Sequence, residues 1–206
     1  MIRHRLLIAA ALSVGMAGLG GCISVLPKTQ PAQLYRFGVE DAASPSTGPK
    51  LGVTLLATDF PRASQGDGIL TVDGARTAYI GGGRWAVPAM IQFREAAERA
   101  FAAHAVRTEL LTRGDLGRSE ANLKIDVTSF EARYHGGGAP LVVVALKVRL
   151  SGVDGKVLVD QPVRAERPAA ANRTGAIVDA FDAATKDALA QVVSLTDGKV
   201  QGRTPS

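Results

Sequence analysis

A long amphipathic stretch near the C-terminus constrains the fold more than any other feature of this sequence. From about Thr174 to Leu195, apolar side chains recur every three or four residues, which predicts a helix with one continuous apolar stripe. The stripe consists of Ile177, Phe181, Ala184, Ala188, Val192 and Leu195. A helix of this kind is stable only when another layer of secondary structure covers the stripe.

A second helix is predicted to begin near Pro88. Proline is favoured in the first helical turn, where its missing N–H costs no hydrogen bond. The apolar residues at helical spacing are Met90, Phe93, Ala97 and Phe101. The charged residues of this segment fall on the opposite side of the helix. This helix is therefore also expected to pack on another layer of secondary structure.

Several other segments are typical of strands. Leu123, Ile125 and Val127 alternate with polar residues, which indicates a half-buried strand. The turn pairs Asp73-Gly74 and Asp154-Gly155 predict two hairpins. Further strand candidates are Tyr35–Phe37, Leu51–Ala57, Ile69–Val72, Ala75–Ile80, Leu141–Ala145 and Leu146–Leu150. We therefore expect an α+β fold with one mostly antiparallel sheet and two long helices packed on one face.

The N-terminus predicts export and lipidation. Arg3 and Arg5 precede an uncharged apolar stretch, Leu6 to Leu19, which is too short to span a bilayer but typical of a signal peptide. Leu19-Gly20-Gly21-Cys22 fits the lipobox pattern, and Cys22 is the only cysteine of the chain. We expect Cys22 to be the lipidated first residue of the mature protein, which leaves no thiol for disulfides or metal binding.

The chain of 206 residues is short enough for a single domain. We expect residues 1–21 to be a signal peptide, 22–33 a lipid-anchored tether, 34–197 the folded domain and 198–206 a flexible tail. The formal charge of +5 becomes about +3 when a signal peptide with two arginines and no acid is removed. A mildly basic surface suits anionic lipid headgroups or an acidic partner, and without a run of basic residues nucleic acid is not an expected partner.

No motif for catalysis, metal binding or cofactor binding is present. His104 and His135 have no metal-ligand spacing, and there is no nucleophile elbow. Neither glycine triplet, 81–83 or 136–138, continues into a phosphate-loop or dinucleotide motif, so both are interpreted as flexible turns. We expect no catalytic residues, no metal and no cofactor, and an exported hydrolase with carboxylates paired only in space is the least favoured class.

Arg84 and Trp85 are the candidate partner-binding residues. They follow the glycines at 81–83 and precede Pro88, and arginine and tryptophan are enriched at binding hot spots. The alternative is that Trp85 packs on the core just before the helix. If the contact lies elsewhere, the basic strand positions Lys147 and Arg149 are the next candidates.

The sequence resembles the ABC-type transport auxiliary lipoproteins of the paraquat-inducible protein C type, which accompany MCE-domain lipid transport systems. The run Arg84-Trp85-Ala86-Val87-Pro88 is the most specific part of the resemblance, and Phe37 in place of a common leucine is a departure. Other matching positions are Tyr35, Arg36, Tyr79, Met90, Gln92, Phe93, Leu123–Val127, Phe130, Glu131, Tyr134, Asp154, Gly155, Ala180, Phe181 and Ala184.

This resemblance implies a non-enzymatic auxiliary component of lipid transport that faces the periplasm. An MCE-domain protein would be its partner, with the ABC permease and ATPase as separate chains, and a homo-oligomeric ring is expected by analogy. Because Ile23 is not the aspartate that commonly retains lipoproteins in the inner membrane, we expect outer-membrane anchoring. The alternative is a structural or regulatory lipoprotein of outer-membrane or cell-wall assembly.

Overall fold

The computed structural model describes residues 31–39, 48–112, 115 and 117–200. The expected signal peptide, Cys22 and most of the expected tether and tail lie outside these residues. The chain divides into two units at the bond between Pro31 and Ala32, and every element described below belongs to the second unit. The elements are β1 (Gln33–Tyr35), β2 (Leu51–Leu55), β3 (Gly68–Asp73), β4 (Arg76–Trp85), α2 (Ala89–His104), β5 (Thr108–Leu111), β6 (Ser119–Tyr134), β7 (Leu141–Gly152), β8 (Val157–Pro168) and α3 (Thr174–Lys199).

Strand β6 organises a single eight-stranded sheet. One edge of its 16 residues pairs with β7, which in turn pairs with β8. The other edge is shared, because β2 pairs with the first part of β6 and β3 pairs with its end. Strand β5 extends the arm that starts with β2, and strands β4 and β1 extend the arm that starts with β3.

The sheet is mixed, so the expectation of a mostly antiparallel sheet is wrong. The predicted hairpins β3–β4 and β7–β8 are antiparallel, as is β6–β7. The pairs β1–β4, β2–β5, β2–β6 and β3–β6 are parallel. Parallel neighbours need a long crossover connection, and the local turn signals that reveal hairpins do not reveal such pairs.

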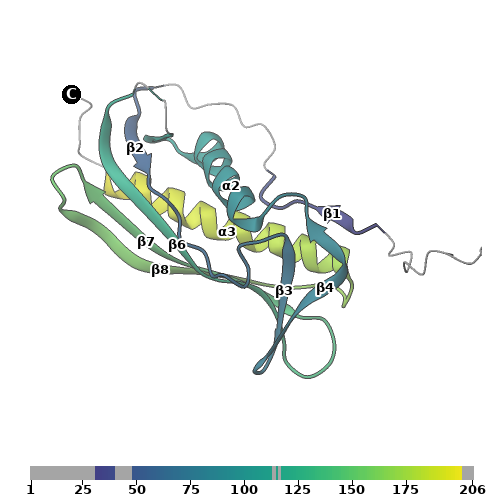
Figure 1. Cartoon of the computed structure of the whole chain (residues 1–206). Helices are drawn as coiled ribbons and strands as arrows, with labels where there is room; N and C mark the ends of the chain where they lie inside the picture. The colour runs from purple at the N-terminus through teal and green to yellow at the C-terminus, as the bar shows by residue number, and fades with distance from the viewer. Residues whose placement is uncertain (1–30, 40–47, 113–114, 116, 201–206) are drawn as a thin grey trace, which may run out of the picture. The chain divides into compact units, whose positions relative to one another are not determined.

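The two helices pack against each other and on the same side of the sheet (Figure 1). Helix α3 covers β7 and β8, and α2 lies between α3 and β5. The predicted α3 stripe is buried except for Leu195, which is partly buried. The α2 stripe is turned relative to the prediction, since Met90 is 39% exposed while Ala89, Phe93 and Ala96 are buried. An α+β fold is thus confirmed.

Local turn chemistry explains the hairpins. Gly74 and Gly155 have φ of 60° and 81°, a region that L side chains rarely adopt, and both occupy the predicted turns. Gly81–Gly83 is not a separate turn but lies inside β4. There β4 has extra residues opposite β3, because the register shifts between Gly68 and Leu70. Strand β1 ends before Phe37, which is fully buried outside any strand.

Candidate functional site

The junction between β4 and α2 carries the two predicted partner-binding residues. Arg84 and Trp85 are the last residues of β4, where successive side chains point to opposite faces. Trp85 is 2% exposed, whereas the Arg84 side chain is 60% exposed and forms an ion pair with Asp67 at 3.2 Å. The two side chains therefore do not form one contact surface. Trp85 packs in the core, as the alternative interpretation predicts, and binding by Arg84 stays a prediction.

Trp85 is part of an aromatic cluster that joins distant parts of the chain. Its ring meets those of Phe37 and Phe181 edge-to-face, with centroids 4.9 Å and 5.3 Å away. Phe130 of β6 completes the cluster, 5.0 Å from Phe37 and 4.8 Å from Phe181. Edge-to-face aromatic pairs add to the stability gained from burial alone. The cluster fixes β4, β6, α3 and the segment after β1 relative to one another.

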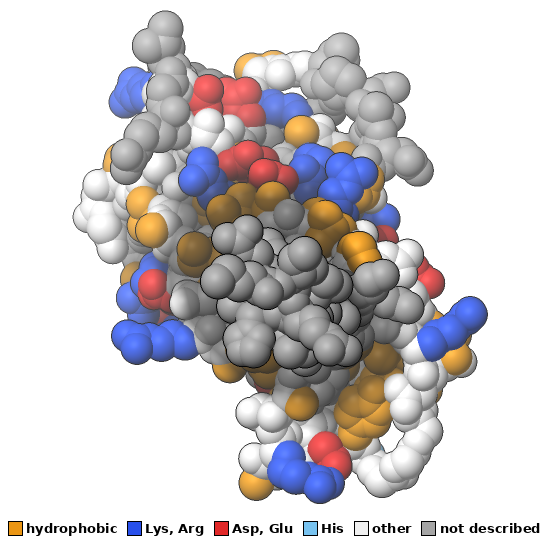
Figure 2. All heavy atoms as spheres, turned by 45° about the vertical axis from the view of Figure 1, so that its right-hand side comes forward, with side chains coloured by type: hydrophobic (Ala, Val, Ile, Leu, Met, Phe, Trp, Pro, Cys, Tyr) orange, Lys and Arg blue, Asp and Glu red, His pale blue; other side chains and the backbone are white. Residues whose placement is uncertain are grey.

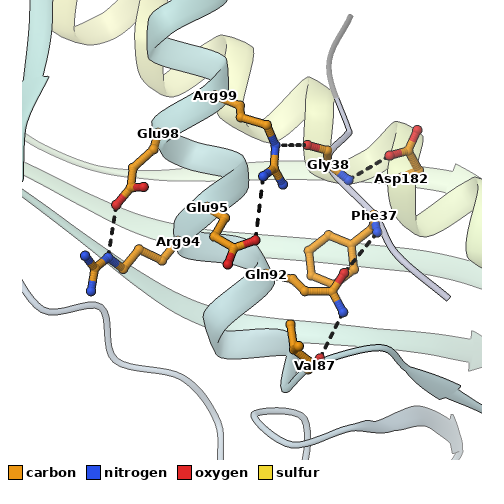
Figure 3. Close-up of polar contacts among 9 residues, drawn as sticks. All are labelled: Phe37, Gly38, Val87, Gln92, Arg94, Glu95, Glu98, Arg99 and Asp182. Atoms are coloured by element: carbon orange, nitrogen blue, oxygen red, sulfur yellow. Dashed lines mark hydrogen bonds and ion pairs between the residues drawn. The ribbon is translucent and has the colours of Figure 1, made fainter. Parts of the chain in front are cut away.

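Next to this cluster, polar side chains of both helices hold the backbone of Phe37 and Gly38 (Figure 3). Gln92 of α2 accepts a hydrogen bond from the Phe37 N–H at 3.2 Å and donates one to the Val87 carbonyl at 2.9 Å. Asp182 of α3 accepts a bond from the Gly38 N–H at 2.7 Å. Arg99 of α2 donates one to the Gly38 carbonyl at 3.0 Å. We call Phe37, Gly38, Gln92, Arg99 and Asp182 the anchor-side clamp.

The anchor-side clamp has a strict steric requirement at Gly38. Its φ is 63°, and a Cβ built on it would lie 2.3 Å from the Ala96 Cβ. Only glycine fits, because another residue would both be strained and collide with α2. The chain is thus tightly held only five residues after β1 begins, at the end of the domain nearest in sequence to Cys22.

Sequence reasoning did not find the clamp. Gln92 is noted there only as a position that matches the family, and Asp182 is not among the residues that the sequence singles out. The one local signal is a buried aromatic residue followed directly by glycine, Phe37-Gly38. The partners are too distant in sequence for any spacing rule, since Gly38 and Asp182 are 144 residues apart.

An exposed apolar groove runs along the first half of α2. It has a volume of about 480 Å³ and is lined by Ala57, Thr58, Met90, Ile91, Arg94, Glu95 and Glu98. Met90 and Ile91 are 39% and 45% exposed. An adjoining groove of about 370 Å³ continues past Leu56, which is 41% exposed. We call the two together the α2 groove.

The α2 groove exists because β2 and β3 share one edge of β6 and leave an irregular segment between them. The segment after β2 runs beside the middle of β6, between the part of β6 that pairs with β2 and the part that pairs with β3. Two backbone hydrogen bonds hold it there, from Leu56 N–H to the Leu123 carbonyl and from Val127 N–H to the Asp59 carbonyl. This irregular segment forms one wall and α2 the other. Arg94 and Glu98 pair at 3.1 Å across its rim. An apolar floor with a paired, charged rim suits an apolar side chain of a partner protein.

Figure 2 shows the described surface with the side that carries β1 and β4 turned forward. Acidic side chains lie between basic ones in the upper part, directly above a band of hydrophobic side chains. Charges of both signs and exposed apolar surface are thus close neighbours on this face. The pattern differs from a single-sign field of the kind that steers nucleic acid.

On the outer sheet face, Lys147 and Arg149 share one acidic partner. Both residues pair with Asp160 of β8, at 3.8 Å and 2.6 Å. Hydrogen bonding from Arg149 lowers the pKa of Asp160 below its usual range. On β6, hydrogen bonds to Asp59 and then to Asp126 raise the pKa of Lys124. As the next candidate for partner contact, this face therefore carries basic residues that are already engaged in ion pairs.

The described residues show neither a cluster of metal ligands nor a membrane-spanning helix. Within residues 31–39, 48–112, 115 and 117–200, no group of three or more His, Cys, Asp or Glu side chains could hold a metal ion. In the same part of the chain, no helix is both long and apolar enough to cross a bilayer. Cys22, the predicted lipidation site, lies outside the described residues, so lipidation stays a prediction.

The fold matches solved structures. The crystal structure of protein XCC0632 from Xanthomonas campestris is 23% identical, with a TM-score of 0.70, and the alignment covers 84% of this chain and all of that one. The hypothetical protein CT253 from Chlamydia trachomatis is 10% identical with a TM-score of 0.54, covering 75% of this chain and all of that one. At these identities the likeness concerns the fold alone.

Comparison by sequence gives a clear family. Among curated proteins the search finds no match. The family model of the ABC-type transport auxiliary lipoprotein component matches residues 36–193, which begins two residues before the clamped Gly38 and ends near the end of α3. The matched region includes the aromatic cluster, the anchor-side clamp and the α2 groove. The chain therefore belongs to the ABC-type transport auxiliary lipoprotein family.

Proposed function

We propose that this lipoprotein is a non-enzymatic auxiliary subunit of an ABC/MCE-type lipid transport system that maintains the cell envelope. The lipid on Cys22 anchors it in the outer membrane, and the folded domain faces the periplasm. It contacts an MCE-domain protein and, through that protein, the ABC permease and ATPase. Family membership and the lipobox at Leu19-Gly20-Gly21-Cys22 support this proposal.

The α2 groove is the observation that carries the partner-binding part of the proposal. Leu56, Val87, Met90 and Ile91 are each at least 39% exposed, and three of them lie within five residues at the start of α2. Contiguous exposed apolar residues rimmed by charges are typical of protein–protein contact sites. This surface overlaps the run Arg84 to Pro88 that is most specific to the family, because Val87 belongs to both.

The clamp gives this surface a defined place. Gln92 bonds both to the segment that leads from the anchor and to Val87, the first residue of the exposed surface. The α2 groove therefore has a fixed position relative to β1, where the tether enters the fold. In this arrangement the lipoprotein keeps its partner within reach of the membrane.

A site-specific crosslink tests the groove. A photoreactive amino acid at Ile91 of the lipidated full-length protein, in intact cells, is expected to crosslink to the MCE-domain protein. The same amino acid at Val157, which is 51% exposed on β8, is the matched control and is expected not to crosslink. Equal yields from both positions, or no crosslink from Ile91 while the complex still copurifies, would place the contact elsewhere.

A separate experiment tests the anchor. Cys22→Ala is expected to abolish labelling with radioactive palmitate and to release the protein from membranes. The wild-type protein is expected to sediment with the outer membrane in a density gradient. Label retained by the variant, or wild-type protein in the inner-membrane fraction, contradicts the proposed anchoring.

We also propose that several copies of this lipoprotein assemble into a ring. MCE assemblies are symmetric rings, and a partner of a ring commonly matches its symmetry. A ring of this lipoprotein is proposed on that analogy. Light scattering of the detergent-solubilised protein measures its mass, and a monomer at concentrations that support partner binding contradicts the ring.

A further inference from the structure

The β1–β4 pair presents a second exposed surface, which is turned away from the core. Leu34 of β1 and Arg84 of β4 are register partners in this parallel pair, so their side chains lie on the same face. The next pair, Tyr35 and Trp85, turns inward. Leu34 is 63% exposed, and the Arg84 side chain is 60% exposed. Arg36, two residues after Leu34, is exposed as well.

We call Leu34, Arg36 and Arg84 the β1 surface. Arg36 has no acidic partner among the described residues, and Arg84 keeps most of its side chain in solvent while it contacts Asp67. An exposed leucine thus has one arginine as its neighbour on the adjacent strand and another two residues along the chain. A guanidinium forms bidentate hydrogen bonds with phosphate groups, and an apolar side chain between cations is typical of proteins that lie on a lipid surface.

The length of the tether brings this surface to the membrane. Ten residues separate Cys22 from Gln33. A flexible chain of that length spans about 18 Å on average, and a fully extended one no more than about 36 Å. The β1 surface is the part of the fold in which the tether ends. The anchor-side clamp keeps it in place, because Gly38 is bonded to both helices just beyond β1.

We propose that the β1 surface rests on the membrane to which the protein is anchored, with Leu34 in the headgroup layer and Arg36 and Arg84 on anionic phospholipid headgroups. The inference rests on the proposed lipidation of Cys22. The β1 surface differs from the α2 groove both in its residues and in the partner that it contacts. An acidic protein would suit the two arginines, but the tether and the exposed leucine favour the bilayer, so an acidic protein becomes an outcome of the test.

The chain offers a clean reporter for this contact. Cys22 is the only cysteine, and its thiol is consumed by lipidation, so Leu34→Cys introduces a single reactive thiol. Val153→Cys in the β7–β8 turn is the matched control, because Val153 is 65% exposed and Leu34 is 63% exposed. Each lipidated full-length variant is labelled with an environment-sensitive fluorophore and reconstituted into phosphatidylcholine vesicles with or without phosphatidylglycerol. Nitroxide lipids in the same vesicles quench fluorophores that touch the bilayer.

We expect the label at position 34 to be quenched several-fold more than the label at position 153, and more strongly when phosphatidylglycerol is present. Replacing both arginines, Arg36→Gln and Arg84→Gln, is expected to remove this dependence on phosphatidylglycerol. Equal quenching at both positions overturns the proposal. If quenching at position 34 is the same with and without phosphatidylglycerol, and the same in the double variant as in the protein with both arginines, the role of the arginines is wrong.

Two further outcomes separate the sources of failure. Failure of the wild-type protein to float with vesicles contradicts lipidation at Cys22, and then the proposed function and this inference fall together. If the protein floats but position 34 is not quenched, only the β1 surface is wrong. A crosslink from position 34 to an acidic protein in cells, without quenching in vesicles, assigns the surface to that protein and overturns the membrane contact.

Discussion

Gly38 lies so close to Ala96 that a Cβ on residue 38 would be 2.3 Å from the Ala96 Cβ. This contact places the segment after β1 directly on α2, and Gln92 and Arg99 of α2 together with Asp182 of α3 bond to its backbone. The relationship couples the end of the domain nearest in sequence to Cys22 to the helix that carries the α2 groove. The same glycine therefore supports both the stability of the fold and the position of the groove that we propose for partner binding.

Gly38→Ala is expected to be strongly destabilising. The φ of 63° costs an L residue about 1–2 kcal/mol, and the collision with Ala96 adds about 1–3 kcal/mol of overpacking. Urea unfolding measures the sum. Gly74→Ala is the matched control, because Gly74 has φ of 60° but a Cβ there would meet nothing within 4 Å. Equal losses from the two variants would show that the contact with Ala96 contributes nothing.

Gln92→Leu tests the polar half of the clamp. Gln92 is 2% exposed, and the variant leaves the Phe37 N–H and the Val87 carbonyl without their partner. An unsatisfied buried polar group costs about 1–3 kcal/mol, and only the Phe37 N–H is buried because Val87 is an exposed residue, so we expect a loss of about 1–3 kcal/mol in urea unfolding. Gln191→Leu, at an exposed position of α3, is expected to change stability by less than about 0.5 kcal/mol. A Gln92→Leu protein as stable as wild type would mean that other groups satisfy both backbone atoms.

The helices and hairpins were predictable because their signals are local. The α3 stripe from Ile177 to Val192 repeats at helical spacing, and Gly74 and Gly155 mark turns that need positive φ. The parallel pairs were not predictable. The pairing of β2 with β6 joins segments more than sixty residues apart, and no turn between them records it.

The candidate site likewise combines features with local sequence signals and features that depend on long-range contacts. Arg84 and Trp85 were predicted to bind a partner together, and the glycines at 81–83 suggested a turn where the chain continues as a strand. Without the strand, the period-two alternation that sends Arg84 outward and Trp85 inward could not be applied. The clamp depends on Asp182, which approaches Gly38 only after α3 has packed on α2. Such contacts are a consequence of the tertiary fold.

Asp160 is expected to make stability depend on pH. Hydrogen bonding from Arg149 lowers its pKa in the folded state, so the stabilisation is present above the ordinary aspartate pKa of about 4 and is lost as pH falls through the lower folded value. Asp160→Asn should therefore lower the thermal midpoint slightly at pH 7, and the difference from wild type should close in acid. Because the pair is exposed, the effect is small. A difference that stays constant between neutral and acid pH contradicts this linkage.

Arg84 and Trp85 are expected to separate cleanly when each is truncated alone. Trp85→Ala empties the centre of the aromatic cluster with Phe37 and Phe181, so we expect a loss of about 3–5 kcal/mol in urea unfolding. Arg84→Ala removes only an exposed ion pair with Asp67 and should change stability by less than about 0.5 kcal/mol.

The same two positions can be tested for function by measuring how well variants protect the cell envelope against detergents. If Arg84 contacts membrane or partner, Arg84→Ala keeps its unfolding curve but weakens envelope protection against detergents, whereas Trp85→Phe, which keeps an aromatic ring in the core, retains protection. Loss of protection in Trp85→Phe with an unchanged unfolding curve would mean that the indole reaches a partner after all. That result would require β4 to move when the partner binds, because in the structure described here the Trp85 ring lies between Phe37 and Phe181 with 2% of its surface exposed.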